Sequence, residues 1–179
     1  MKSLHVAPIL ALAFGLLGYG GVLPADDGEI TAKGRSRAVS LDVVCPKDGS
    51  DLERFAAAEL QRYLKRLFGA SVRMTPSPDG TANGTFLLGT SARSLAGFGL
   101  HETALPHLSD QGFLLRKTSC KNVPAIAIVG GSPRAVLWGV YELVERYGVT
   151  YLLNGDVYPE KQPAFHLPEV DQVFEPTFK

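Results

Sequence analysis

The sequence predicts an α+β domain of α/β-like type, in which one mixed β-sheet carries two long helices packed on one face. Two observations predict this fold. Short apolar runs recur along the chain, and two longer segments have apolar residues at helical spacing. The resulting order of elements, β-α-β followed by β-β-α, fits helices that pack together against a sheet. With 179 residues, the chain can form about one domain with a full hydrophobic core.

The first residues have the pattern of a secretory signal peptide. Lys2 precedes an apolar run over residues 6–17, which is shorter than the roughly 20 apolar residues that a membrane span needs. Ala25 offers a cleavage site, so we expect residues 1–25 to be removed and residues 26–34 to form an extended lead-in. The protein is then expected to be secreted or periplasmic, with no membrane attachment after cleavage.

Short apolar segments bounded by Gly, Pro and polar residues predict the strands. The expected strands are residues 38–44, 70–74, 85–88, 112–117 and 125–129, and a final extended segment is expected at residues 149–153. The fourth and fifth are expected to form a hairpin through a turn that contains Cys120. A short helix is expected near residues 91–97. We expect the domain to cover residues 35–160, and the proline-containing tail over residues 161–179 to cross the surface as a linker.

The first long helix has clear start and stop signals. Ser50 is a favourable N-cap, and Glu53 three residues later completes a capping box. Gly69 is suited to the residue just after the last helical turn. Apolar side chains between these ends fall on one stripe, with basic residues opposite, so the stripe is expected to face the sheet.

The second long helix follows the strand at residues 125–129. Ser132 is expected as its N-cap, with Pro133 at the first helical position. The helix is expected to continue to Tyr147 and to stop at Gly148. Gly130 and Gly131, directly before Ser132, are therefore interpreted as the turn between the strand and this helix. A nucleophile elbow or a phosphate loop is a poorer interpretation, because neither spacing is met.

Composition and motifs argue against several classes of function. The formal net charge is zero, whereas a nucleic-acid-binding protein would carry a basic excess on one face. His101 and His107 are six residues apart with a proline between them, so they do not match a zinc helix. We expect no metal and no cofactor. Cys45 and Cys120 could pair in an exported protein, but two thiols leave the disulfide undecided.

No pair of carboxylates stands out as the two catalytic acids of a glycoside hydrolase. Most acidic residues have a simpler role at a helix start or on a charged helix face, and two lie in the exit segment without an identifiable partner. The acids considered are Asp51, Glu53, Glu142, Glu145, Asp156 and Glu160. We expect no catalytic residue within this chain.

The position of Trp138 is not explained by the predicted core. On the second helix, apolar residues such as Val140 and Leu143 define the core side, and Trp138 falls on the other side. It could be covered by a neighbouring domain, by a sugar ring, or by a long side chain such as that of Arg134. We take Trp138, Tyr141 and Arg134 as candidate residues for an interface or for stacking on a sugar.

One long segment and several shorter ones resemble a known family. The segments are residues 130–149 (GGSPRAVLWGVYELVERYGV), 56–64 (AAAELQRYL), 87–89 (LLG), 110–113 (DQGF) and 155–159 (GDVYP). Together they resemble the N-terminal domain of α-glucuronidases and related glycoside hydrolases. That domain is similar to the one preceding the barrel of β-N-acetylhexosaminidases. The resemblance covers roughly residues 35–179.

The resemblance implies a zincin-like shape without the metal and catalytic acids in a following (β/α)8 barrel. The last residues, Pro176 to Lys179, look like the start of the junction into that barrel. The family often has an Arg and an aromatic residue where this chain has Thr150 and Tyr151, which weakens a specific assignment to α-glucuronidase. No catalytic residue of the family can be transferred to this chain.

We therefore expect a non-catalytic supporting domain of an exported glycoside hydrolase that acts on xylan or a related glycan. The chain is expected to be a fragment or a short open reading frame, with the barrel as its partner and a glycan as a further partner. The alternative is a free-standing carbohydrate-binding module that uses Trp138. A small hydrolase in its own right is a third possibility, and we expect no such activity.

Overall fold

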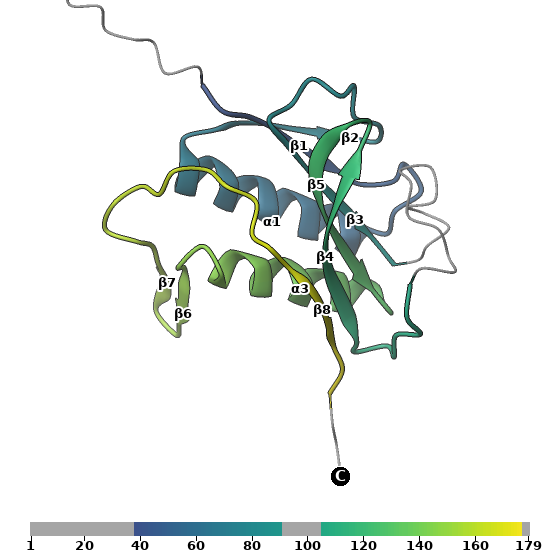
Figure 1. Cartoon of the computed structure of the whole chain (residues 1–179). Helices are drawn as coiled ribbons and strands as arrows, with labels where there is room; N and C mark the ends of the chain where they lie inside the picture. Colours follow the sequence, from purple (N-terminus) through teal and green to yellow (C-terminus); the bar gives the residue numbers. More distant parts are fainter. Residues whose placement is uncertain (1–37, 91–104, 177–179) are drawn as a thin grey trace, which may run out of the picture. The chain divides into compact units, whose positions relative to one another are not determined.

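The computed structural model describes residues 38–90 and 105–176 of the chain. They form a six-stranded mixed sheet, two helices and a two-stranded hairpin, which confirms the predicted α/β architecture (Figure 1). The sheet strands are β1 (Ser40–Val44), β2 (Ser71–Thr75), β3 (Gly84–Gly89), β4 (Phe113–Cys120), β5 (Val123–Gly130) and β8 (Asp171–Phe174). The helices are α1 (Asp51–Phe68) and α3 (Pro133–Glu145), and the hairpin is β6 (Thr150–Leu152) with β7 (Gly155–Val157). The predicted signal peptide, the lead-in and the helix near residues 91–97 lie outside the described residues.

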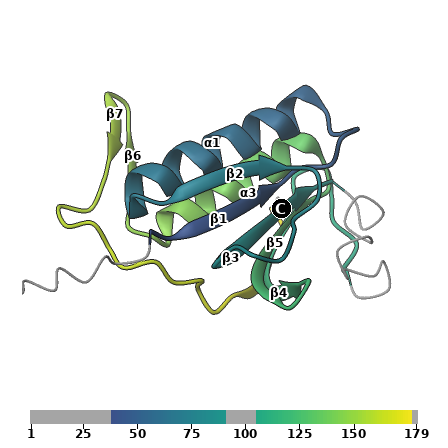
Figure 2. The same ribbon diagram turned by 90° about the horizontal axis from the view of Figure 1, so that it is seen from above.

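The sheet has the strand order β2-β1-β3-β5-β4-β8. Strands β2, β1, β3 and β5 are parallel to one another, whereas β4 is antiparallel to both β5 and β8. Helix α1 is the crossover between the parallel strands β1 and β2, which a tight turn cannot connect. Both helices lie on the same side of the sheet (Figure 2).

The central strands are buried on both faces. On β1, Leu41 and Val43 point into the core that α1 and α3 close, whereas Val44 belongs to a smaller core on the opposite face. The same alternation holds for β3 and β5. Each fully buried large apolar side chain stabilises the fold by roughly 1.5–3 kcal/mol relative to exposure.

The ends of α1 are as the sequence predicted. The Ser50 hydroxyl accepts from the Glu53 backbone N–H at 3.2 Å, and the Glu53 carboxylate accepts from the Ser50 N–H at 2.7 Å. Glu53 is buried and also accepts from the backbone N–H of Thr90 at 3.0 Å. It therefore joins the start of α1 to the segment after β3. Gly69 ends the helix with a left-handed backbone at φ 59°.

The hairpin between β4 and β5 is tighter than expected. Its turn consists of Lys121 and Asn122, both with positive φ, which is the geometry of a two-residue turn between antiparallel strands. Cys120 is therefore the last residue of β4 and is buried, whereas the sequence placed it in the turn. Lys121 Nζ donates to the carbonyl of Pro78 at 2.6 Å, which explains how a lysine is held in this turn.

The two cysteines are free and lie on opposite faces of the sheet. Cys45 belongs to the core under the helices, and Cys120 to the smaller core on the other face. Burial raises the pKa of both thiols, so they stay protonated at neutral pH. The disulfide that the sequence left undecided is not formed.

Helix α3 begins as predicted and ends slightly earlier. Ser132 caps it by accepting from the Ala135 N–H at 3.2 Å, and Pro133 is its first residue. The helix ends at Glu145 instead of Tyr147. The chain then tightens, because the Gly148 N–H donates to the Glu145 carbonyl at 2.8 Å and Gly148 has φ 89°.

The C-terminal segment, expected as a linker over residues 161–179, instead adds an outer strand to the sheet. Strand β8 pairs antiparallel with β4, from Phe113 opposite Phe174 to Arg116 opposite Asp171. Arg146 at the end of α3 donates to Gln172 at 2.6 Å, which ties this strand to the helix layer. The extended segment expected at residues 149–153 is β6, and its partner β7 was not predicted.

Glu175, directly after β8, holds the end of the chain against the loop before β4. Its carboxylate accepts from the Ser109 N–H at 2.8 Å and from the Ser109 hydroxyl at 2.5 Å. These hydrogen bonds favour the charged form and lower the pKa of Glu175 from its ordinary 4.5.

We expect acidification to release this contact. The pKa of Glu175 is lower in the folded state than in the unfolded chain. The contact therefore contributes its full stabilisation at pH values above the unfolded-state pKa, and this stabilisation is lost as the pH falls through the folded-state pKa. A carboxyl-detected NMR titration should give a pKa below 4.5 for Glu175, and Ser109→Ala should raise that pKa toward 4.5. An unchanged titration in Ser109→Ala would contradict the assignment.

Candidate functional site

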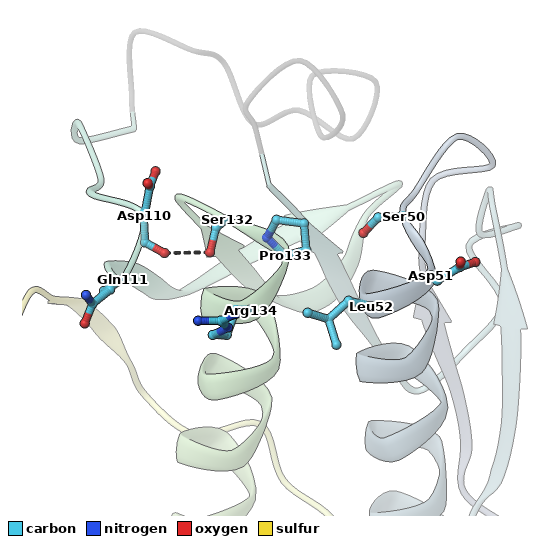
Figure 3. Close-up of a pocket in the computed structure, with 8 residues that line it drawn as sticks. All are labelled: Ser50, Asp51, Leu52, Asp110, Gln111, Ser132, Pro133 and Arg134. Atoms are coloured by element: carbon cyan, nitrogen blue, oxygen red, sulfur yellow. Dashed lines mark hydrogen bonds between the residues drawn. The ribbon is translucent and has the colours of Figure 1, made fainter.

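A pocket of about 710 Å³ lies between the N-terminal ends of α1 and α3 (Figure 3). Its lining residues are Ser50, Asp51, Leu52, Asp110, Gln111, Ser132, Pro133 and Arg134. Helix N-termini favour negative charge. Arg134 adds a cation, but Asp51 and Asp110 also line the pocket and oppose an anion.

The serines of this pocket have structural roles. The Ser132 hydroxyl donates to the backbone carbonyl of Asp110 at 2.5 Å while it accepts from the helix (Figure 3). A hydroxyl engaged on both sides is not positioned as a nucleophile. This geometry supports the N-cap interpretation of Ser132.

The two glycines before Ser132 are required by close packing. A Cβ at Gly130 would lie 2.5 Å from the backbone nitrogen of Val136, and one at Gly131 would lie 1.9 Å from the Ser109 carbonyl oxygen. The motif therefore allows β5, α3 and the loop before β4 to approach one another. No phosphate is needed to explain it.

Trp138 lies elsewhere on α3, in a separate groove of about 310 Å³. Its side chain is 37% exposed, as expected for the outward side of the helix. The groove is lined by Gln111, Phe113, Trp138, Phe174, Glu175 and Pro176. The end of β8 thus lies beside Trp138 and covers it in part, whereas the sequence predicted that this segment is a linker.

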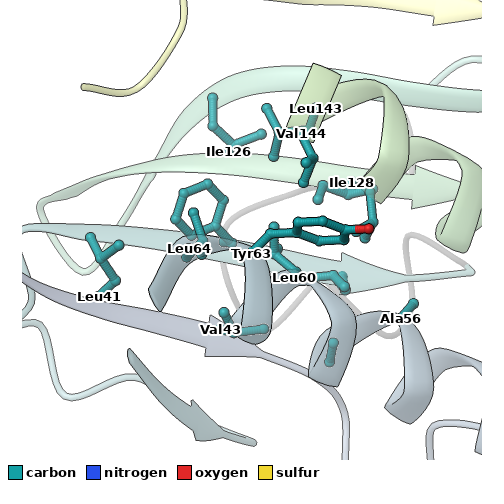
Figure 4. Close-up of a cluster of buried hydrophobic side chains, with 14 of the residues drawn as sticks. Leu41, Val43, Ala56, Leu60, Tyr63, Leu64, Ile126, Ile128, Leu143 and Val144 are labelled. Atoms are coloured by element: carbon teal, nitrogen blue, oxygen red, sulfur yellow. The ribbon is translucent and has the colours of Figure 1, made fainter. Parts of the chain in front are cut away.

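Tyr141 belongs to a third location, a cluster of tyrosines under the β6–β7 hairpin. Its ring is T-shaped to Tyr63 at 6.4 Å and to Tyr151 at 5.2 Å, and its hydroxyl is 3.5 Å from Glu59. Tyr63 is the centre of this cluster and is 2% exposed, packed beside Leu60 and Leu64 of its own helix (Figure 4).

A hydrogen bond from Tyr63 holds the hairpin on the helix pair. The Tyr63 hydroxyl donates to the Asp156 carboxylate at 2.7 Å, and Arg62 lies 3.6 Å from the same carboxylate. Burial, followed by the hydrogen bond to Asp156, raises the pKa of Tyr63. The phenol therefore remains a donor at any ordinary pH.

The carboxylates that are buried or half-buried are occupied by neighbouring groups. Asp42 is 1% exposed and receives two hydrogen bonds from Arg73, at 2.9 and 2.8 Å. Glu59 is paired with Arg62 in the same two-point way, and Glu53 serves the α1 cap. These acids act in the packing of the domain.

The three residues that the sequence singled out do not form one site. Arg134 lines the pocket at the helix starts, Trp138 lines the groove beside β8, and Tyr141 packs in the tyrosine cluster. Sequence reasoning missed Phe113, Phe174 and Glu175 as neighbours of Trp138, because it placed the tail outside the sheet.

Within residues 38–90 and 105–176, no group of three or more His, Cys, Asp or Glu side chains could hold a metal ion. His101 lies outside these residues. His166 is exposed and its Nδ1 lies 3.3 Å from the Ala164 carbonyl. In the same part of the chain, neither helix is long and apolar enough to cross a membrane.

The Tyr63–Asp156 hydrogen bond predicts a local effect of Tyr63→Phe. We expect the free energy of unfolding to fall by about 1 kcal/mol, because a half-buried carboxylate loses a donor. Amide hydrogen exchange should accelerate over residues 150–157. Tyr147→Phe is the matched control, since its hydroxyl donates to the His166 carbonyl at 3.0 Å, away from the hairpin. Equal exchange over residues 150–157 in both variants would refute the role of Tyr63.

The solved structures that show distant similarity to this chain include two large enzymes. One is a GH138 enzyme targeting pectin rhamnogalacturonan II, at 14% identity and a TM-score of 0.44, over 61% of this chain and 13% of that chain. The other is a GH115 4-O-methyl-α-glucuronidase with specificity for decorated arabinogalactans. It matches at 18% identity and a TM-score of 0.44, over 63% of this chain and 14% of that chain.

The matched residues thus cover less than one sixth of the length of either enzyme. Comparison with curated protein sequences finds no match. The family model for the N-terminus of glycosyl hydrolase family 67 matches residues 29–143, which is more than half of the chain. This match confirms the resemblance seen in the sequence, and the chain belongs to the glycosyl hydrolase family 67 N-terminal domain family.

Proposed function

We propose that this chain is the supporting N-terminal domain of an exported α-glucuronidase-type glycoside hydrolase that acts on xylan or a related glycan. The match to the family 67 N-terminus carries the proposal. The catalytic acids would lie in a following (β/α)8 domain. The role of residues 35–179 would be to pack against that domain and to support it.

The positions of the acidic side chains support a role without catalysis. Glycoside hydrolysis uses two carboxylates across a cleft, one of them able to donate a proton. In the described part of the chain, Asp42, Glu53 and Glu59 are each held by cations or helix N–H groups. Asp156, which the sequence left without a partner, is bound by Tyr63.

Export is supported by the sequence alone. Lys2 and the apolar run over residues 6–17 have the pattern of a signal peptide, with cleavage after Ala25. Secreted or periplasmic localisation is part of the proposal for that reason. It suits an enzyme whose substrates are large glycans outside the cell.

A second candidate function is a free-standing carbohydrate-binding module. The observation that favours it is the exposed Trp138 ring in a groove with the polar side chains of Gln111 and Glu175. Aromatic faces flanked by polar groups suit sugar rings. Tyr141 is less suited to this role, because it packs against Tyr63 and Tyr151.

The test of the main proposal begins with the coding sequence beyond Lys179. We expect an open frame for a barrel with paired acidic residues at its strand ends. The longer protein should release uronic acid from glucuronosylated xylo-oligosaccharides, and the present chain should release none. Turnover by the purified chain above the buffer rate would overturn the supporting role.

The same purified chain separates the second candidate from the first. We expect calorimetric titration with xylo-oligosaccharides to show no binding. Binding that is lost in Trp138→Ala and kept in Phe55→Ala would establish the binding module instead. Phe55 is the matched control, because it is an aromatic residue of α1 that is 50% exposed.

A further inference from the structure

The groove of Trp138 lies where the described chain leaves the sheet. Two of its lining residues, Glu175 and Pro176, directly follow β8, and Pro176 is the last residue that the structure describes. A segment that continues from Pro176 therefore starts at the wall of this groove.

The floor of the groove is held rigidly. The rings of Phe113 and Phe174 are stacked at 4.6 Å with an interplanar angle of 13°. A Cβ at Gly139 would lie 2.8 Å from Ile128 and 3.2 Å from Phe113, so α3 sits very close to the sheet next to Trp138. The backbone that carries Trp138 is thereby fixed.

The rim of the groove is polar and is also held in place. Glu175 is bound to Ser109 through two hydrogen bonds. Outside the groove, Gln172 of β8 accepts from Arg146, the residue directly after α3. A rigid aromatic centre within a polar rim is typical of the residues that contribute most to protein interfaces. Because these walls are already ordered, little conformational entropy is lost when a partner binds.

We propose that the Trp138 groove is the docking site for the domain that follows Pro176 in the longer protein. This inference rests on the proposed function. A domain tethered at the groove wall has a high effective concentration there, which favours it over a free partner. The partner surface would insert an apolar side chain against Trp138 and offer polar groups to Gln111.

The test uses the longer protein and compares Trp138→Glu with Phe55→Glu. Both substitutions place a charge at an exposed aromatic position, but Phe55 lies on α1 and does not line the groove. Limited proteolysis after residue 176 and calorimetric melting report whether the two domains remain docked. The unfolding midpoint of the present chain carrying Trp138→Glu shows whether the domain itself is intact.

We expect Trp138→Glu to accelerate cleavage at the junction by about thirtyfold, the effect of losing an interface hot spot. Trp138→Glu should also separate the melting of the two domains. Phe55→Glu should leave the cleavage rate and the melting of the longer protein unchanged, and Trp138→Glu should leave the unfolding midpoint of the present chain unchanged. Equal cleavage in both variants of an active enzyme would overturn the docking site and leave the proposed function standing. A dimer that is lost in Trp138→Glu would overturn the docking site, because a second copy of the chain would then occupy the groove. Protection of the junction from cleavage by added oligosaccharide would overturn it too, because a glycan would then occupy the groove. The absence of a barrel would overturn both proposals.

Discussion

Strands β1, β3 and β5 run parallel through the middle of the sheet, and each must be covered on both faces. Parallel neighbours also cannot be joined by a tight turn, so the chain has to cross over the sheet between them. Helix α1 meets both needs, because it is the crossover between β1 and β2 and buries Leu60, Leu64 and Tyr63 against the sheet. Helix α3 returns from β5 beside it. The rest of the domain is arranged around this helix pair.

This arrangement places different chemistry at different edges. Both helices start close together, so their first turns and the loop before β4 surround one pocket. Both helices support the β6–β7 hairpin, since Tyr141 of α3 packs against Tyr151 and Tyr63 of α1 donates to Asp156. The outer side of α3 meets β8 at Trp138. Residues only a few positions apart on one helix, such as Arg134, Trp138 and Tyr141, thus face three separate surroundings.

The sequence predicted the parts of the fold that local rules govern. Ser50, Glu53 and Gly69 bounded α1 correctly, Ser132 and Pro133 started α3, and apolar runs located the central strands. Long-range pairing was not predictable in this way. Strand β8 is short and mostly exposed, so its pairing with β4 depends on Phe174 meeting Phe113 and on Arg116 meeting Asp171. The same limit applies to the candidate site. Helical spacing predicted that Trp138 faces away from the core. Its neighbours Phe174 and Glu175 were not predicted, because the segment around β8 has no periodic pattern of apolar residues.

The late position of β8 has a practical consequence for protein made as a fragment. Residues 113–116 of β4 find their second partner only in residues 171–174. A chain cut near residue 160 would leave that side of β4 with unpaired N–H and C=O groups and would uncover Phe113. Open strand edges of this kind pair with other chains and favour aggregation. Poor solubility of such a fragment would reflect the missing strand, and would not indicate an unstable core.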